Sequence, residues 1–288
     1  MINDWTDGDV DGNIVAQDEL ERIEIGLLLE GIYSISGFDF RNYLRSSLQR
    51  RIKYRLSLEG LRTITALLEK VLHEPGFINK LLNDFSIKVT EMFRDPSFFA
   101  ALRTEVIPSL RALPEIRIWH AGCATGEEVY SMAILLQEEG LLEKTKLYAT
   151  DMNEYAIEIA KQGRFPLKRM QTFTKNYLKA GGTKEFSAYY TTDHDYALFH
   201  PDIKKNMTFA QHNLATDRSF NEFHLILCRN VLIYFDSDLQ SRVHRLFFES
   251  LSQNGFLALG NMESIISNQK THYNDINCSE RIFRKSMS

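Results

Sequence analysis

Apolar residues recur at helical spacing in the first third of the chain. From Ile23 to about Leu82 they fall three or four positions apart, which is typical of helices that bury one face. The spacing predicts three or four short helices around these apolar positions: Ile25, Leu28, Leu29, Ile32, Tyr43, Leu44, Leu48, Ile52, Leu56, Ile64, Leu67, Leu68, Val71 and Leu72. We expect them to form a small helical domain over residues 23–84.

After Pro114, short apolar runs alternate with amphipathic segments. Five runs are typical of buried strands, at residues 116–119, 146–149, 207–210, 223–227 and 256–259. Helical periodicity is clearest over residues 127–139 and 236–251, where Asp236 is a suitable N-cap. Alternating strands and helices favour a mostly parallel sheet with right-handed crossovers. The sequence therefore predicts an α/β domain over residues 85–288.

Residues 162–201 interrupt this alternation. They contain Gly163, Gly181, Gly182 and the aromatic, threonine-rich run 188–192, a composition that predicts turns and short antiparallel strands. We expect an inserted small antiparallel β-subdomain here.

Composition excludes several classes of protein. The 288 residues are 44% hydrophobic and 25% charged, as in globular proteins. The net charge of -4 argues against a whole-protein electrostatic grip on nucleic acid. Three widely spaced cysteines suggest neither a disulfide framework nor a zinc site. No run reaches the roughly 18 apolar residues of a membrane span, and the acidic N-terminus does not resemble a secretory signal. We expect a cytoplasmic protein without a metal.

Charge is unevenly distributed along the N-terminal third. Eight acidic residues and one arginine precede position 25, so we expect residues 1–22 to form an acidic flexible tail. Between positions 41 and 55 every charged residue is basic: Arg41, Arg45, Arg50, Arg51, Lys53 and Arg55. A solvated helix face is the simpler interpretation of this run, and a docking surface for an acidic partner is the alternative.

A turn with two glycines joins the first predicted strand to the next helix. Gly122 and Gly126 allow the backbone to approach a ligand closely at the sheet edge. The third glycine of the dinucleotide-binding pattern is missing, and Glu127 and Glu128 would repel phosphate oxygens. The turn therefore favours a cationic ligand without phosphate, such as S-adenosylmethionine, over a nicotinamide dinucleotide. A plain tight turn explains the glycines equally well.

Polar residues also follow other strands. Asp151 ends the second strand, where a carboxylate can accept hydrogen bonds from both hydroxyls of a ribose, or it caps the helix that follows. Three polar residues follow the fourth strand, at the edge where ligands bind open α/β sheets: Arg229, Asn230 and Tyr234. Residues 88–96 by themselves indicate the start of a helix at Pro96.

Six motifs occur in a fixed order along the chain. They are Thr-x-x-Phe-Arg-Asp-Pro (90–96), Trp-x-Ala-Gly-Cys-Ala-Thr-Gly-Glu-Glu-x-Tyr-Ser (119–131), Ala-Thr-Asp (149–151), Asn-Leu (213–214), Cys-Arg-Asn-Val-Leu-Ile-Tyr-Phe-Asp (228–236) and Gly-x-x-Glu-Ser (260–264). This combination resembles the CheR family, the chemotaxis-receptor glutamate O-methyltransferases, over about residues 25–285. The resemblance implies a Rossmann-like, S-adenosylmethionine-dependent methyltransferase sheet with an inserted β-subdomain and a small all-α N-terminal domain.

The resemblance also implies roles for single residues. Together with Gly122, the implied contacts of S-adenosylmethionine are Lys88, Thr90, Arg94, Glu128, Asp151, Asn213, Leu214, Arg229 and Asn230. Asp151 is implied on the ribose and Glu128 near the amino-acid end, although whether Glu127 or Glu128 faces the ligand stays open. Arg94 and Tyr234 are implied to lie nearest the reacting carboxylate. The family usually has Asn in place of Lys88, Ser or Gly in place of His120, and Asp in place of His224.

The implied reaction methylates glutamate side chains of methyl-accepting chemotaxis receptors and yields a glutamate methyl ester and S-adenosylhomocysteine. The basic run 41–55 is implied to approach the acidic methylation helices of the receptor. The β-subdomain resembles the family's site for a receptor C-terminal tail peptide, and whether this chain binds such a tail is open. A cofactor-bound adaptor without catalysis is the alternative. A nucleic-acid methyltransferase is disfavoured, because Arg-Asn-Val-Leu follows the fourth strand instead of Asn/Asp-Pro-Pro-Tyr/Phe.

Overall fold

The computed structural model describes residues 9–85 and 90–286, and the chain divides into two compact units, Met1–Phe85 and Ser86–Ser288. Within the described ranges, no helix combines the length and apolarity that crossing a membrane requires.

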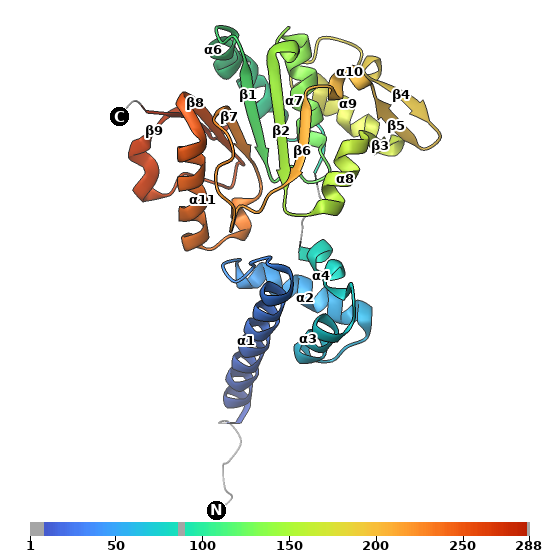
Figure 1. Cartoon of the computed structure of the whole chain (residues 1–288), viewed down its shortest axis with the longest axis vertical. Coiled ribbons are helices and arrows are strands. Elements are labelled where there is room, and N and C mark those ends of the chain that lie inside the picture. Colours follow the sequence, from blue (N-terminus) through green and yellow to red (C-terminus); the bar gives the residue numbers. More distant parts are fainter. Residues whose placement is uncertain (1–8, 86–89, 287–288) are drawn as a thin grey trace, which may run out of the picture. The chain divides into compact units, whose positions relative to one another are not determined.

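The smaller unit is built from four helices in its described part: α1 (Asp9–Ser36), α2 (Arg45–Glu59), α3 (Ile64–His73) and α4 (Phe77–Phe85) (Figure 1). α1 packs on α3, and α2 packs on α4. The apolar positions that predicted helices supply the core, in which Leu28, Ile32, Ile52 and Leu67 are fully buried. The predicted helical domain is therefore correct.

The acidic segment near the N-terminus differs from the expected tail, because residues 9–22 are part of α1. Polar residues can extend a helix without an apolar period when its later turns are packed and charged pairs support the exposed ones. Arg22 donates to Glu19 at 2.9 Å, and Glu21 pairs with Lys53 of α2 at 3.1 Å. Residues 1–8 of the expected tail lie outside the described residues.

The larger unit contains a seven-stranded sheet in the order β6-β2-β1-β7-β8-β10-β9 (Figure 1). Its strands are β1 (Ile116–Ala121), β2 (Thr145–Asp151), β6 (Met207–Gln211), β7 (Phe223–Cys228), β8 (Leu251–Leu259), β9 (Tyr273–Asn277) and β10 (Ile282–Lys285). The first five pair in parallel, whereas β10 pairs antiparallel with β8 and β9. This arrangement confirms the predicted α/β class and all five predicted strands.

Helices flank the sheet: α5 (Pro96–Ala101), α6 (Ile107–Arg111), α7 (Glu127–Glu138), α8 (Glu154–Gln162), α10 (Pro201–Lys204) and α11 (Ser237–Ser250). Asp236 caps α11 as predicted, since its side chain accepts from the amide of Leu239 at 2.8 Å. Trp119 of β1 is fully buried, and its ring packs against Phe223 and Phe247.

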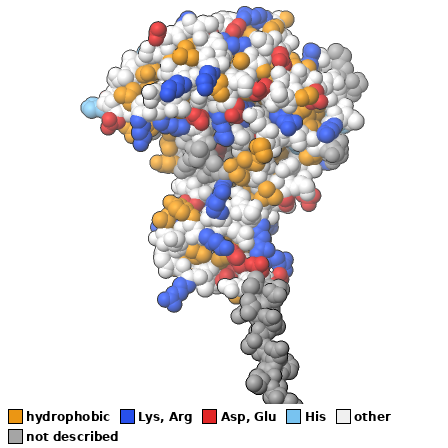
Figure 2. Space-filling view, turned by 180° about the vertical axis from the view of Figure 1, so that it is seen from behind, with side chains coloured by type: hydrophobic (Ala, Val, Ile, Leu, Met, Phe, Trp, Pro, Cys, Tyr) orange, Lys and Arg blue, Asp and Glu red, His pale blue; other side chains and the backbone are white. Residues whose placement is uncertain are grey.

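The expected insertion forms a separate antiparallel sheet in the order β3-β5-β4, from β3 (Arg164–Pro166), β4 (Tyr190–Asp193) and β5 (Tyr196–Phe199). It also contains the helix α9 (Met170–Lys179), which the sequence analysis did not predict. Phe173 and Tyr177 of α9 are buried in the common core. On the face in Figure 2, basic and acidic side chains of this unit are interspersed, in keeping with the balanced composition.

The side chain of His244 on α11 is fully buried. Burial lowers the pKa of His244 from its ordinary 6.5 to about 4. The unfolded chain therefore binds this proton more tightly than the folded chain. We expect the free energy of unfolding to fall by up to about 3 kcal/mol as the pH drops from 6.5 towards 4, with no contribution from this group above that window.

Urea unfolding of His244→Leu measures this effect, with His73→Leu as a control at an exposed histidine of α3. The acid loss of stability should shrink in the first variant and persist in the second. Equal acid slopes in all three proteins would show that another group is responsible.

Candidate functional site

The carboxyl ends of the parallel strands place the candidate residues at one edge of the sheet. Ala121 of β1 lies opposite Thr150 of β2, and Asp151 of β2 lies opposite Gln211 of β6. The turn after β1, residues 122–126, is tied to this edge because the amides of Gly122 and Cys123 donate to the Thr150 carbonyl at 2.8 and 2.9 Å.

Gly122 is required by the packing of two loops. Its φ of +82° is rarely adopted by other residues, and a Cβ there would lie 2.5 Å from Cγ2 of Val231, which follows β7. The turn after β1 and the loop after β7 therefore touch at Gly122. The sequence predicted that a ligand approaches the backbone closely at Gly122. In the structure, the loop after β7 also approaches Gly122 closely.

Asp151 does not cap the next helix. The cap of α8 is Asn153, whose side chain accepts from the amide of Ala156 at 3.3 Å. The two carboxylate oxygens of Asp151 instead accept from the amides of Ala124 and Asn153, each at 2.9 Å. Of the two interpretations of Asp151, capping is wrong, and its carboxylate is fixed beside the turn after β1.

Glu127 and Glu128 have different surroundings. Glu127 is buried, accepts from the Thr125 hydroxyl at 2.6 Å and pairs with Arg169 at 2.7 Å, and burial raises its pKa. Glu128, in the first turn of α7, is half-buried. Burial opposes its ionisation, but the bond to His120 and the charge of Arg229 outweigh that effect and lower the pKa of Glu128.

His120 and Arg229 hold the two oxygens of Glu128. Nδ1 of His120 lies 2.9 Å from Oε1, and Nη1 of Arg229 lies 3.2 Å from Oε2. His120 is fully buried, and its Nδ1 is paired with Glu128, whereas its Nε2 has no hydrogen-bond partner among the described residues. His224 is a structural histidine, since its Nδ1 accepts from the amide of Arg117 at 3.0 Å and burial lowers its pKa.

Arg229 links β7 to the segment before α5. Its buried guanidinium pairs with Asp95 at 2.6 Å, donates to the Arg94 carbonyl at 3.3 Å and lies 3.9 Å from the ring centroid of Phe98. A buried cation with these partners positions the 94–98 segment against the sheet edge. Arg94 is thereby brought to the end of β7, which sequence spacing alone did not reveal.

The remaining predicted residues are distributed around the same edge. Asn213 follows β6 and accepts from the Ala215 amide at 2.9 Å, and Leu214 is next to it. Tyr234 closes the short helix Leu232–Tyr234 after β7. The carbonyl of Thr90 accepts from Arg169. Lys88 lies outside the described residues.

Glu263 is a site residue that the sequence analysis quoted in a motif without a role. Its buried carboxylate accepts from the amides of Asn230, Val231, Leu232 and Ile233 at 2.8 to 3.4 Å, and from the amide of Gly260. It thus fixes the loop that carries Asn230 and Tyr234. The donors are backbone groups, so no side-chain pattern could have indicated this arrangement.

Three carboxylates lie around the turn after β1: Asp151 is held by backbone amides, whereas Glu127 and Glu128 pair with Arg169 and Arg229. Burial, and then the charges of Asp151, Glu128 and Glu127, raise the pKa of the Cys123 thiol well above its usual range. Carboxylates at this edge suit hydroxyl or cationic groups of a ligand and disfavour a phosphate. In the described part of the chain, no group of His, Cys, Asp and Glu side chains could hold a metal ion.

The basic run 41–55 is only partly available at the surface. Arg51 is buried and donates to the Phe85 carbonyl, and Arg55 binds both carboxylate oxygens of Asp84 at 2.6 and 2.9 Å. These two arginines were included in the expected docking surface, and the structure corrects this because they stabilise the smaller unit internally. The exposed members are Arg41, Arg45, Arg50 and Lys53, of which Arg41 pairs with Asp39 and Glu30.

Comparison with known proteins gives matches over almost the whole chain. The profile of the CheR methyltransferase SAM binding domain matches residues 88–282, and that of the CheR methyltransferase all-alpha domain matches residues 23–86. A candidate methyltransferase named Cher3 from Pseudomonas putida is 50% identical, over 92% of this chain and 97% of its own. The chemotaxis protein methyltransferase of Borreliella burgdorferi is 28% identical, over 90% and 92% of the two chains.

Proposed function

The chain belongs to the CheR methyltransferase family, and on this premise we propose that it methylates glutamate side chains of chemoreceptors. The products are a glutamate methyl ester and S-adenosylhomocysteine, and the reaction serves adaptation in cytoplasmic chemotaxis signalling. Relatives named chemotaxis protein methyltransferases support this assignment. The observation that carries it is the carboxylate of Asp151, which the amides of Ala124 and Asn153 fix beside the turn after β1.

The residues present fit S-adenosylmethionine. This molecule carries a sulfonium and an ammonium group but no phosphate, and three carboxylates surround the turn that would receive it. Asp151 would accept hydrogen bonds from its ribose hydroxyls, and Glu128 would lie near its amino-acid end. The other proposed contacts of the cofactor are Thr90, Arg94, Gly122, Asn213, Leu214, Arg229 and Asn230, together with Lys88. Arg229 also pairs with Asp95, and Glu127 pairs with Arg169.

The chemistry needs no general base. When bound, S-adenosylmethionine supplies a methyl group on a sulfonium, which a carboxylate oxygen takes directly while the sulfur leaves as a thioether. A glutamate with its ordinary pKa near 4.3 is already ionised at neutral pH, so no proton is removed. The protein therefore contributes orientation, with the attacking oxygen about 3 to 3.5 Å from the methyl carbon and in line with the bond that breaks.

Arg94 and Tyr234 are the proposed catalytic residues. Arg94 is held next to the end of β7 through its own carbonyl and through its neighbour Asp95. A guanidinium that binds one carboxylate oxygen orients the nucleophile and leaves the other oxygen to attack, whereas a grip on both oxygens would stabilise the ground state. The side chain of Tyr234 lies on the loop that Glu263 fixes.

Replacing Arg94 with alanine tests this role. We expect kcat to fall by about 100-fold while the Kd for S-adenosylmethionine changes by less than about threefold, because orientation of the carboxylate is lost and the other proposed cofactor contacts, such as Asp151, remain. Arg94→Lys, which keeps the positive charge but not the planar guanidinium with its paired N–H donors, should recover part of kcat. Stopped-flow kinetics and calorimetry separate the two effects, and a loss confined to cofactor affinity would rule out the proposed role.

Receptor docking involves the smaller unit in this proposal. The exposed basic residues Arg41, Arg45, Arg50 and Lys53 would steer the acidic methylation helices of the receptor. A receptor tail peptide would add a strand to the small sheet, where β4 is an edge strand with Thr191, Thr192 and Asp193 exposed.

Mass spectrometry of a purified chemoreceptor cytoplasmic fragment, incubated with the protein and S-adenosylmethionine, tests the substrate assignment. Methyl groups on glutamate side chains are expected. Cofactor binding without any methylated glutamate would favour the alternative, an adaptor that binds the cofactor without catalysis.

A further inference from the structure

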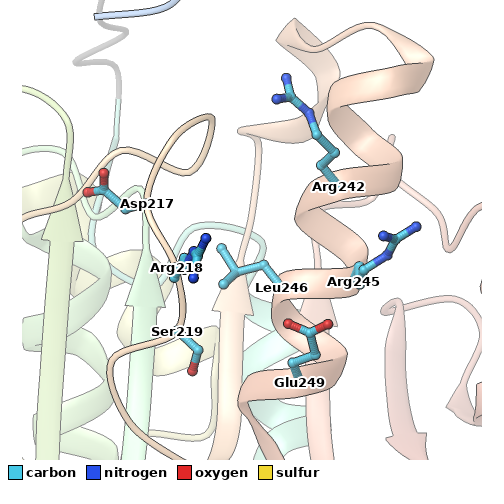
Figure 3. Close-up of a pocket in the computed structure, with 7 residues that line it drawn as sticks. All are labelled: Asp217, Arg218, Ser219, Arg242, Arg245, Leu246 and Glu249. Atoms are coloured by element: carbon cyan, nitrogen blue, oxygen red, sulfur yellow. The ribbon is translucent and has the colours of Figure 1, made fainter. Parts of the chain in front are cut away.

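An arginine-lined groove lies on the larger unit outside the proposed site. One wall is the loop residues Asp217, Arg218 and Ser219, and the other is α11 with Arg242, Arg245, Leu246 and Glu249 (Figure 3). The groove is open to solvent and has a volume of about 490 Å³. Figure 3 shows Arg218 and Leu246 pointing toward each other across it.

Both walls of the groove are close along the chain to residues of the proposed site. The loop leads from Asn213, and α11 begins directly after the loop that carries Tyr234. At a rise of 1.5 Å per residue, Arg242 and Arg245 lie about 8 and 12 Å along α11 from its first residue, Ser237. A chain segment with one residue in the site could therefore extend into the groove within a few residues.

The loop wall is held firmly in place. Nε2 of His212 lies 3.1 Å from the Arg218 carbonyl, and the His212 ring packs against Trp119 and Phe220 in edge-on and tilted contacts. Asp217 accepts from the Asn213 amide at 2.9 Å and from the Thr216 hydroxyl at 3.0 Å. Both oxygens of Asp217 thus accept hydrogen bonds within the loop, which orients this side chain.

The groove is lined by three arginines and by the two carboxylates of Asp217 and Glu249, so its net charge is positive by one. Arg218 and Arg245 are exposed and form no ion pair with any described residue, and Arg242 is exposed beside them. Guanidinium groups spaced along a groove suit separate carboxylates. The lining has no aromatic side chain to stack on a base, and Glu249 at one end would repel a compact polyphosphate. An acidic peptide fits these features better than a nucleotide.

We propose that this groove binds the acidic segment of the protein substrate that flanks the methyl-accepting glutamate. The inference rests on the proposed function and adds a second contact to it, on the larger unit. Its contribution is to affinity for the protein substrate, because the arginines do not touch the reacting atoms.

Direct binding of a defined peptide tests the groove separately from catalysis. The probe is a fluorescein-labelled peptide of alternating glutamate and alanine, measured by anisotropy with the full chain. We expect the double variant Arg242→Glu/Arg245→Glu to bind it about tenfold more weakly, and the salt dependence of binding to decrease. The matched variant Lys175→Glu/Lys179→Glu, which reverses two exposed charges on α9, should bind as the wild type does.

Kinetics with a chemoreceptor fragment complete the test. In the arginine double variant the KM for the fragment should rise about tenfold while kcat stays within about twofold, since only substrate affinity is changed. Equal peptide binding by both double variants would overturn the proposal, as would stronger competition by ATP than by the unlabelled peptide. Peptide binding that depends on the arginines, without methyl transfer by the wild type, would refute the proposed function and leave the groove intact.

Discussion

Replacing Asp151 with alanine is expected to weaken binding of S-adenosylmethionine by about 100-fold and to reduce methyl transfer in proportion at low cofactor concentration. The carboxylate is fixed by the amides of Ala124 and Asn153, so its orientation requires no adjustment when a ribose binds. Each charge-assisted hydrogen bond to a hydroxyl contributes about 1.5 to 3 kcal/mol, and loss of two accounts for at least this change in Kd.

Isothermal titration calorimetry measures this effect directly. Asp275→Ala, an exposed aspartate of β9, is the matched control and should bind the cofactor as the wild type does. Circular dichroism should show that Asp151→Ala is folded, because β2 pairs with strands on both sides. A folded variant with unchanged cofactor affinity would remove Asp151 from the binding site.

Replacing Glu263 with alanine is expected to lower the free energy of unfolding by at least about 3 kcal/mol, because backbone amides at Gly260 and Asn230–Ile233 would lose a buried acceptor. The loop is tightly packed against Gly260, because a Cβ at this position would lie 2.7 Å from the Glu263 carboxylate and 2.8 Å from the Asn230 nitrogen. The loop with Tyr234 should loosen as well, so methyl transfer should fall beyond the loss of folded protein.

Urea unfolding measures the loss of stability. Activity at a temperature where the variant is fully folded measures the additional loss of methyl transfer. Glu154→Ala, at an exposed position of α8, should change stability by no more than about 0.5 kcal/mol. Glu263→Gln, which keeps one carbonyl acceptor, should be intermediate. If alanine at position 263 were tolerated as well as at position 154, the loop would not depend on this carboxylate.

The fold was predictable where one physical pattern dominated. The parallel strands β1, β2, β7 and β8 are largely buried and rich in apolar residues, a pattern that has few alternatives in an α/β chain, whereas the edge strand β6 is only partly buried. β9 was not predicted from the sequence, because three of its five residues are exposed and it contains no apolar run. α9 was missed because its glycine-rich and aromatic surroundings favoured turns, although Phe173 and Tyr177 bury one of its faces.

The site was predictable in its strand-end positions but not in its pairings. The position of Asp151 was evident from the end of β2, whereas its role as a cap was excluded only by the bond of Asn153 to Ala156. Sequence could not distinguish Glu127 from Glu128, because their difference arises from Arg169 and Arg229, which are distant along the chain. The burial of Arg51 was likewise set by tertiary packing, which a run of basic residues does not reveal.

The central claim, carboxyl methyl transfer to chemoreceptors, is tested most directly with labelled S-adenosylmethionine and membranes that contain chemoreceptors from the same organism. Base treatment should release the label as methanol, since methyl esters hydrolyse readily, and Asp151→Ala should incorporate little label at limiting cofactor. Absence of label in the wild type despite cofactor binding, or label that resists base, would contradict the claim.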